Sequence, residues 1–200
     1  YPWKIFHGMN KVASGKSNLL ALDSLLKEQD TLYPKNALHL YFTSNHDENS
    51  WNKADYGTMP GIIHAPFAVF TQTYAQSIPL IYSGQEEPIL EAIPFFYKDT
   101  LTFRQLGREK FYQTLLQLRQ QNPALSALAP LTRIQAGDPK AILAYTRNAK
   151  ENAVLVILNL SPSKQTLSLP AELGGIKAFA IFQNQETQLP SRPFEMDPWG

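Results

Sequence analysis

The distribution of apolar residues divides the chain into two parts with different periodicity. Up to about residue 121, apolar residues recur three and four positions apart or form short runs, a pattern that predicts helices alternating with buried strands. After residue 123 the apolar runs are short and separated by turn residues, which is typical of an antiparallel β domain, and strands are predicted at 131–135, 141–147, 153–160, 165–169 and 177–182. The pattern predicts an α/β unit over residues 1–123 and an all-β unit over residues 124–200.

The first unit carries three helical regions. Residues 5–29 have apolar positions at helical spacing and a break near residues 14–17, so two helices are predicted there. Residues 62–75 are largely apolar, which predicts a helix that is buried on most faces. Residues 103–121 form an amphipathic pattern, and residues 48–60 are polar and turn-rich, as expected of a loop.

Polar side chains follow two strand-like runs of this unit. The sequence Asn-His-Asp at 45–47 follows the apolar run at 37–42, and Glu86 follows the run at 78–83. In a parallel α/β barrel the loops after the strands converge on one mouth, so we expect these side chains to face one site. Residues 1–3 are interpreted as the stub of a further strand.

At these residues the chain resembles a known family. Phe-Thr-Ser-Asn-His-Asp at 42–47 resembles the fourth signature region of the α-amylase family, glycoside hydrolase family 13, and residues 78–86 resemble its eighth barrel strand and following loop. Residues 122–125 fall where the family's last barrel helix ends, and residues 141–161 are similar to the small β-sandwich that follows. A whole barrel needs about 250 residues. The resemblance therefore implies the C-terminal part of a (β/α)8 TIM barrel followed by an antiparallel β-sandwich.

The resemblance also implies a function, the cleavage of α-glucosidic bonds with retention. Asp47 matches the family's transition-state stabiliser, and His46 matches a residue that binds hydroxyl groups of the sugar. The family's nucleophile and general acid, the two carboxyl groups that a retaining glycosidase needs, match no residue here and would lie upstream. The chain alone is therefore expected to be inactive. On its residue type alone, Asp47 would rather be interpreted as an ordinary cap of the helix or turn that follows than as a catalytic residue.

Four further residues and one aromatic run have two interpretations each. Asn45 either supports the substrate loop or forms a turn, and Glu86 either reaches the site or bonds within its own loop. Trp51 and Tyr56 either stack on sugar rings or anchor the loop that carries them. The aromatic run at 95–97 is either a sugar platform or ordinary packing.

The composition of the chain argues against several classes of binding partner. With 18 basic and 17 acidic residues the net charge is +1, which argues against a nucleic-acid surface. No long apolar run indicates a membrane span. The chain has no cysteine, so thiolate zinc sites and disulfides within it are excluded. No metal is assigned to these residues, while the resemblance leaves room for calcium in the parent protein.

The expected partner is an α-glucan or maltooligosaccharide, and a secreted or periplasmic parent is favoured over a cytoplasmic one. Two alternatives to a hydrolase stay open: a non-catalytic carbohydrate-binding or structural relative, and a transglycosylase or isomerase on the same frame. Because two barrel strands leave open edges, self-association of the chain is also expected.

Overall fold

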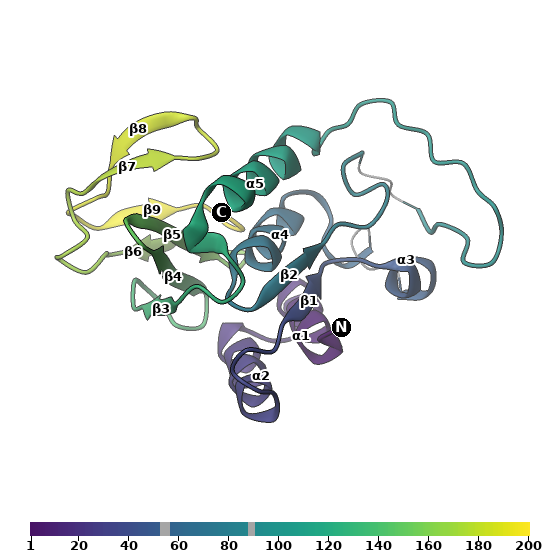
Figure 1. Cartoon of the computed structure of the whole chain (residues 1–200), viewed down its shortest axis with the longest axis horizontal. Helices are drawn as coiled ribbons and strands as arrows, with labels where there is room; N and C mark the ends of the chain where they lie inside the picture. Colours follow the sequence, from purple (N-terminus) through teal and green to yellow (C-terminus); the bar gives the residue numbers. More distant parts are fainter. Residues whose placement is uncertain (53–56, 88–90) are drawn as a thin grey trace.

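The computed structural model describes residues 1–52, 57–87 and 91–200. Helices predominate before residue 125 and strands after it (Figure 1). None of the described helices is both long and apolar enough to cross a membrane. The first part contains α1 (Trp3–Ala13), α2 (Leu19–Leu32), β1 (His39–Phe42), α3 (His46–Asn52), the 3-10 helix η2 (Gly61–Ile63), α4 (His64–Thr73), β2 (Ser77–Leu80), α5 (Glu109–Gln121) and the 3-10 helix η3 (Pro123–Leu125).

The second part consists of seven strands among the described residues. They form a three-stranded antiparallel sheet in the order β3-β4-β5 and two antiparallel pairs, β6-β9 and β7-β8. The last two strands, β8 and β9, were not predicted from the sequence. The strands are β3 (Leu131–Ile134), β4 (Ile142–Ala149), β5 (Asn152–Asn159), β6 (Gln165–Leu167), β7 (Lys177–Ala180), β8 (Gln185–Gln188) and β9 (Phe194–Met196).

The two helices predicted over residues 5–29 are confirmed as α1 and α2, with the break at residues 14–18. Asn18 caps α2, since its Oδ1 accepts a hydrogen bond from the Leu20 N–H at 3.0 Å. The strand expected at residues 1–3 is wrong. Helix α1 already begins at Trp3, because its apolar residues recur at helical spacing and are buried along one face.

The two apolar runs with polar ends pair as parallel strands. The register runs from His39 opposite Ser77 to Phe42 opposite Leu80, so both strands end at the same edge. Helix α4 packs against both of them.

The three-stranded sheet has apolar layers on both of its faces. Side chains of a strand alternate between faces, and Leu143 and Tyr145 of β4 join the core formed with α1, α2, β1 and α4. Ile142 and Ala144, on the opposite face, pack with residues of β6 and β9. One hydrophobic core thus joins the helices to the sheet across residue 123, and the domain boundary at that residue stays a prediction.

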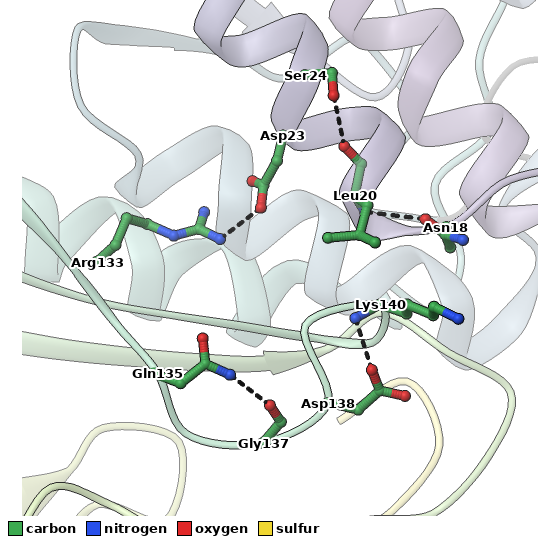
Figure 2. Close-up of polar contacts among 9 residues, drawn as sticks. All are labelled: Asn18, Leu20, Asp23, Ser24, Arg133, Gln135, Gly137, Asp138 and Lys140. Carbon is green, nitrogen blue, oxygen red and sulfur yellow. Dashed lines mark hydrogen bonds and ion pairs between the residues drawn. The ribbon is translucent and has the colours of Figure 1, made fainter.

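Polar contacts reinforce the same junction where α2 faces β3 (Figure 2). Arg133 of β3 forms an ion pair with Asp23 of α2, with Nη2 and Oδ2 2.9 Å apart. At the turn between β3 and β4, the Asp138 side chain accepts a hydrogen bond from the Lys140 N–H at 2.9 Å, and the Lys140 carbonyl accepts one from the Leu19 N–H at 3.0 Å. The start of α2 is therefore held on the sheet.

Two segments differ from the prediction: one predicted loop is partly helical, and one predicted helix is shorter. Part of the loop predicted over residues 48–60 is helical, because α3 extends to Asn52. The helix predicted from residue 103 begins only at Glu109. Residues 104–106 donate backbone hydrogen bonds to the Glu87 carboxylate, and Leu106 has a φ of 48°, which a right-handed helix does not allow.

Candidate functional site

The segments after β1 (residues 43–52) and β2 (residues 82–87) form what we call the strand-end edge. Gln85 joins its two halves. The Gln85 Nε2 donates to Thr43 Oγ1 at 2.8 Å, and its Oε1 accepts from the Tyr82 N–H at 2.7 Å. Because Gln85 is only 4% exposed, these bonds are shielded from water and fix the two loops together. The polar residues predicted to meet at one edge are carried by these joined loops.

Asn45 starts helix α3 within this edge. Its Oδ1 accepts a hydrogen bond from the Glu48 N–H at 2.8 Å, as a helix cap does. The side chain is 1% exposed, and among the described residues its Nδ2 has no hydrogen-bond partner. Asn45 therefore supplies the cap that its residue type allows, while its amide N–H groups keep donor capacity.

His46 and Asp47 lie in the first turn of α3 and face solvent. Their side chains are 52% and 42% exposed, and His46 Nε2 lies 3.7 Å from Asp47 Oδ1. Asp47 is placed where the helix N-terminus favours a negative charge. An accessible carboxylate beside an imidazole can hydrogen-bond sugar hydroxyl groups and can stabilise developing positive charge.

The remaining candidates take different positions around this pair. Trp51 is 63% exposed at the end of α3, with its ring 5.9 Å from that of Phe95 and 6.4 Å from that of Phe96. The Glu86 carboxylate accepts a hydrogen bond from the Gly84 N–H at 3.1 Å, within its own turn. Tyr56 lies outside the described residues.

Two residues of the edge were missed by the sequence analysis. Gln85 and Glu87 flank Glu86, and both hold loops in place rather than adding an exposed charge at His46 and Asp47. Their common signal was a cluster of long polar side chains directly after a predicted strand, of which only Glu86 was selected.

Burial raises the pKa of the neighbouring Tyr82 hydroxyl, so that group stays protonated at neutral pH.

The part of the chain that the structure describes contains no candidate group of metal-binding side chains. No group of three histidine or carboxylate side chains lies together there in a way that could hold an ion.

Comparison with known proteins connects this geometry to one family. Residues 142–200 match the family model described as the α-amylase SusG C-terminal domain. The curated α-amylase MalA of Haloarcula japonica is 28% identical over 187 residues, which are 85% of this chain and 25% of MalA. The resemblance to the α-amylase family is confirmed.

Solved structures show a similar fold over nearly the whole chain. The noncanonic maltogenic α-amylase AmyB of Thermotoga neapolitana matches with a TM-score of 0.78 at 18% identity, covering 98% of this chain and 47% of that one. AmyP, solved with maltotriose, matches with a TM-score of 0.72 at 15% identity, covering 100% of this chain and 48% of AmyP. The α-amylase-like chain thus spans about half of each solved relative and a quarter of MalA.

Proposed function

We propose that this chain supplies the last strands of a TIM barrel, with the attached β-sandwich, to a retaining glycoside hydrolase that cleaves α-glucosidic bonds. The observation that carries the proposal is the parallel register of β1 and β2, which brings residues 43–47 and 82–86 to one edge. The similarity to MalA and AmyB, both α-amylases by name, supports the reaction class. The maltotriose bound by AmyP supports an α-linked glucose chain as the substrate.

In this proposal Asp47 acts on the transition state. Glycoside cleavage passes through an oxocarbenium-like state with positive charge on the sugar ring, which a nearby fixed carboxylate stabilises. The solvent-facing position of Asp47 on a capped helix suits this role, because the cap fixes the helix that carries the carboxylate and the side chain remains accessible. His46 would donate a hydrogen bond to a hydroxyl group of the same sugar.

The other site residues have supporting roles. Asn45 fixes the start of α3, Glu86 shapes its own turn and Trp51 offers an exposed ring to the substrate. No residue of this chain matches the family's nucleophile or general acid, so both are assigned to the parent protein and no turnover is expected from the chain alone.

The test is Asp47→Asn in the parent protein, with a maltooligosaccharide as substrate. Loss of a preorganised charge lowers kcat by about 10²- to 10³-fold. Asp197→Asn is the matched control, because its side chain is 83% exposed and pairs only loosely with Lys164, 3.5 Å away. A rate for Asp47→Asn close to that of Asp197→Asn would show the assignment to be wrong. A parent that binds maltooligosaccharide without cleaving it would favour a non-catalytic carbohydrate-binding relative.

A further inference from the structure

Four aromatic side chains form an exposed patch beside the strand-end edge, which we call the aromatic platform. It consists of Trp51, Phe95, Phe96 and Tyr97, which are 63%, 40%, 75% and 80% exposed. Three of the rings contact one another: the centroids of Phe95 and Phe96 are 4.7 Å apart in an edge-to-face arrangement, and the Trp51 centroid lies 5.9 and 6.4 Å from them. Tyr97 directly follows Phe96 in the chain and is exposed beside them. Large apolar rings gathered at the surface of a soluble protein mark a binding surface more often than chance packing.

The platform is attached to the proposed site rather than to a distant face. Phe95 packs against the His46 ring, with centroids 5.8 Å apart and planes tilted by 31°. Two hydrogen bonds tie the same segment to α3: Ser50 Oγ donates to the Ile93 carbonyl at 2.6 Å, and the Ile93 N–H donates to Asn49 Oδ1 at 2.8 Å. The patch therefore continues directly from His46.

Hydrogen bonds also hold the base of the loop that carries the platform, between Glu87 and residues 104–107. The Glu87 carboxylate accepts hydrogen bonds from the backbone N–H groups of residues 104–106, and the Glu87 carbonyl accepts one from Gly107 at 3.0 Å. The long loop between β2 and α5 is thus closed at its base and attached to α3 near its tip. In Figure 1 this loop and α3 lie at one end of the molecule, and β7 and β8 lie at the opposite end.

The chemistry of the patch fits a sugar ring. A pyranose presents hydroxyl groups at its rim and C–H groups on its faces, so an exposed aromatic face next to a hydrogen-bonding imidazole matches both. We propose that the aromatic platform binds a glucose unit of the α-glucan chain, one or more units away from the sugar held by His46 and Asp47. This inference rests on the proposed function and adds a subsite on the loop between β2 and α5.

The experiment follows the indole N–H signal of Trp51 in NMR spectra of the full chain during titration with maltoheptaose. The chain has three tryptophans, and Trp51→Phe identifies the signal by its loss. We expect the signal to shift with maltoheptaose, and the dissociation constant to rise about two- to tenfold in Phe96→Ala and in Tyr97→Ala, the range that loss of an aromatic stacking contact gives. Both side chains are at least 75% exposed, so neither change should disturb folding.

Phe179→Ala is the matched control. Phe179 is 52% exposed on β7, at the far end of the molecule, and its loss should leave the affinity unchanged. Unchanged affinity in both platform variants, or no shift of Trp51 with maltoheptaose, would overturn the proposal. Equal binding of β-linked cellohexaose would overturn the assignment to α-glucans. A change in the oligomeric mass of Phe96→Ala with glucan binding intact would mean that a second copy of the chain covers the patch.

The two proposals fail separately. If Asp47→Asn abolishes turnover in the parent but the platform variants bind as tightly as the unchanged chain, only the subsite is lost. If Asp47→Asn keeps full activity, the proposed function falls, whatever the platform binds.

Discussion

The surroundings of Arg147 and the strand-end edge differ in whether their buried polar groups have hydrogen-bond partners. Arg147 is fully buried, and its guanidinium donates to the carbonyls of Thr73, Ser126 and Ala129 at 2.6, 2.7 and 3.0 Å. At the strand-end edge, by contrast, the Asn45 Nδ2 and the Ser44 hydroxyl are buried with no hydrogen-bond partner among the described residues. Aromatic rings near that edge are left exposed. The first region thus pairs its buried polar groups, whereas the second leaves hydrogen-bonding groups unpaired and aromatic rings exposed.

The position of Arg147 follows from the alternation of β4. Residues 143, 145 and 147 share the face that meets the helices, and the first two are Leu143 and Tyr145 of the core. The third reaches the C-terminal end of α4, where the last carbonyls lack partners within the helix and favour a cation. Arg119 adds hydrogen bonds to the carbonyls of Gln72 and Ser77. Burial lowers the pKa of Arg147 from its ordinary value, but a guanidinium stays charged at neutral pH.

Replacing Arg147 with methionine should give the largest loss of stability. The change leaves buried carbonyl groups without donors, and hydrogen bonds to charged groups are individually strong, so we expect a loss of about 3–4 kcal/mol in the free energy of unfolding. Urea unfolding measures it directly. Arg133→Met in the same sheet is the control. It removes a partly exposed ion pair to Asp23 and a hydrogen bond to the Tyr74 hydroxyl, and should cost about 1–2 kcal/mol. Equal losses would remove the contrast between the regions.

For the region around Arg147, sequence reasoning predicted most of the helices and strands. It did not predict the contacts that hold them together. Apolar periodicity gave α1, α2, α4 and the strands up to β7, because burial enforces a regular pattern. It could not reveal Arg147, since a strand with one charged residue looks like a strand with one exposed side chain. Strand β8 was missed because it is exposed along its whole length and so carries no apolar alternation, and β9 was missed because three residues are too few to show one.

At the strand-end edge, sequence reasoning identified the functional motif but not the secondary structure that carries it. The motif at 45–47 was recognisable from its residues, but the helix that it begins was mistaken for a loop. Polar residues dominate α3, so its helical structure depends on the Asn45 cap and on the bonds to Ile93, contacts that a local pattern does not contain. The meeting of His46 with Phe95 likewise joins residues 49 positions apart in the sequence. The roles of Asp47, His46, Asn45, Trp51 and Glu86 in catalysis or binding stay predictions.

The next test asks whether Gln85 holds the two halves of the edge together. Gln85→Met removes the bond to Thr43 Oγ1 and the acceptor of the Tyr82 N–H, which leaves buried polar groups unpaired. We expect a loss of about 1–2 kcal/mol in the free energy of unfolding. Gln188→Met, on exposed β8, should change stability by no more than about 0.5 kcal/mol. If the two variants are equally stable, the edge is not joined through this side chain.

A smaller and more local effect is expected from Asn45→Ala. Removing the cap of α3 should weaken that helix by about 1 kcal/mol, while Asn45→Asp keeps an accepting oxygen and should retain the cap. Amide hydrogen exchange of Glu48 and Asn49 reports the change, since their N–H groups bond to Asn45 at 2.8 Å each. Faster exchange in the alanine variant only is the expected result. Equal exchange rates in all three proteins would argue against the cap.

The smallest effect concerns pH at the base of the platform loop. Hydrogen bonds from the backbone N–H groups, that of Leu106 above all, lower the pKa of the Glu87 carboxyl below its ordinary value of 4.5. A carboxyl group whose pKa is lowered by folding stabilises its surroundings above its unfolded pKa and loses that effect as the pH falls through the folded value. We therefore expect the amide shifts of Gln105 and Leu106 to stay constant from neutral pH down to about 4.5 and to change below it, as the loop base loses its acceptor. Glu87→Gln should abolish this pH dependence, because the amide side chain does not titrate, whereas Glu172→Gln should preserve it. Unchanged titration of both amides in Glu87→Gln would show that a different group holds the loop. In that case the aromatic platform would depend on its bonds to α3 alone for its position beside His46.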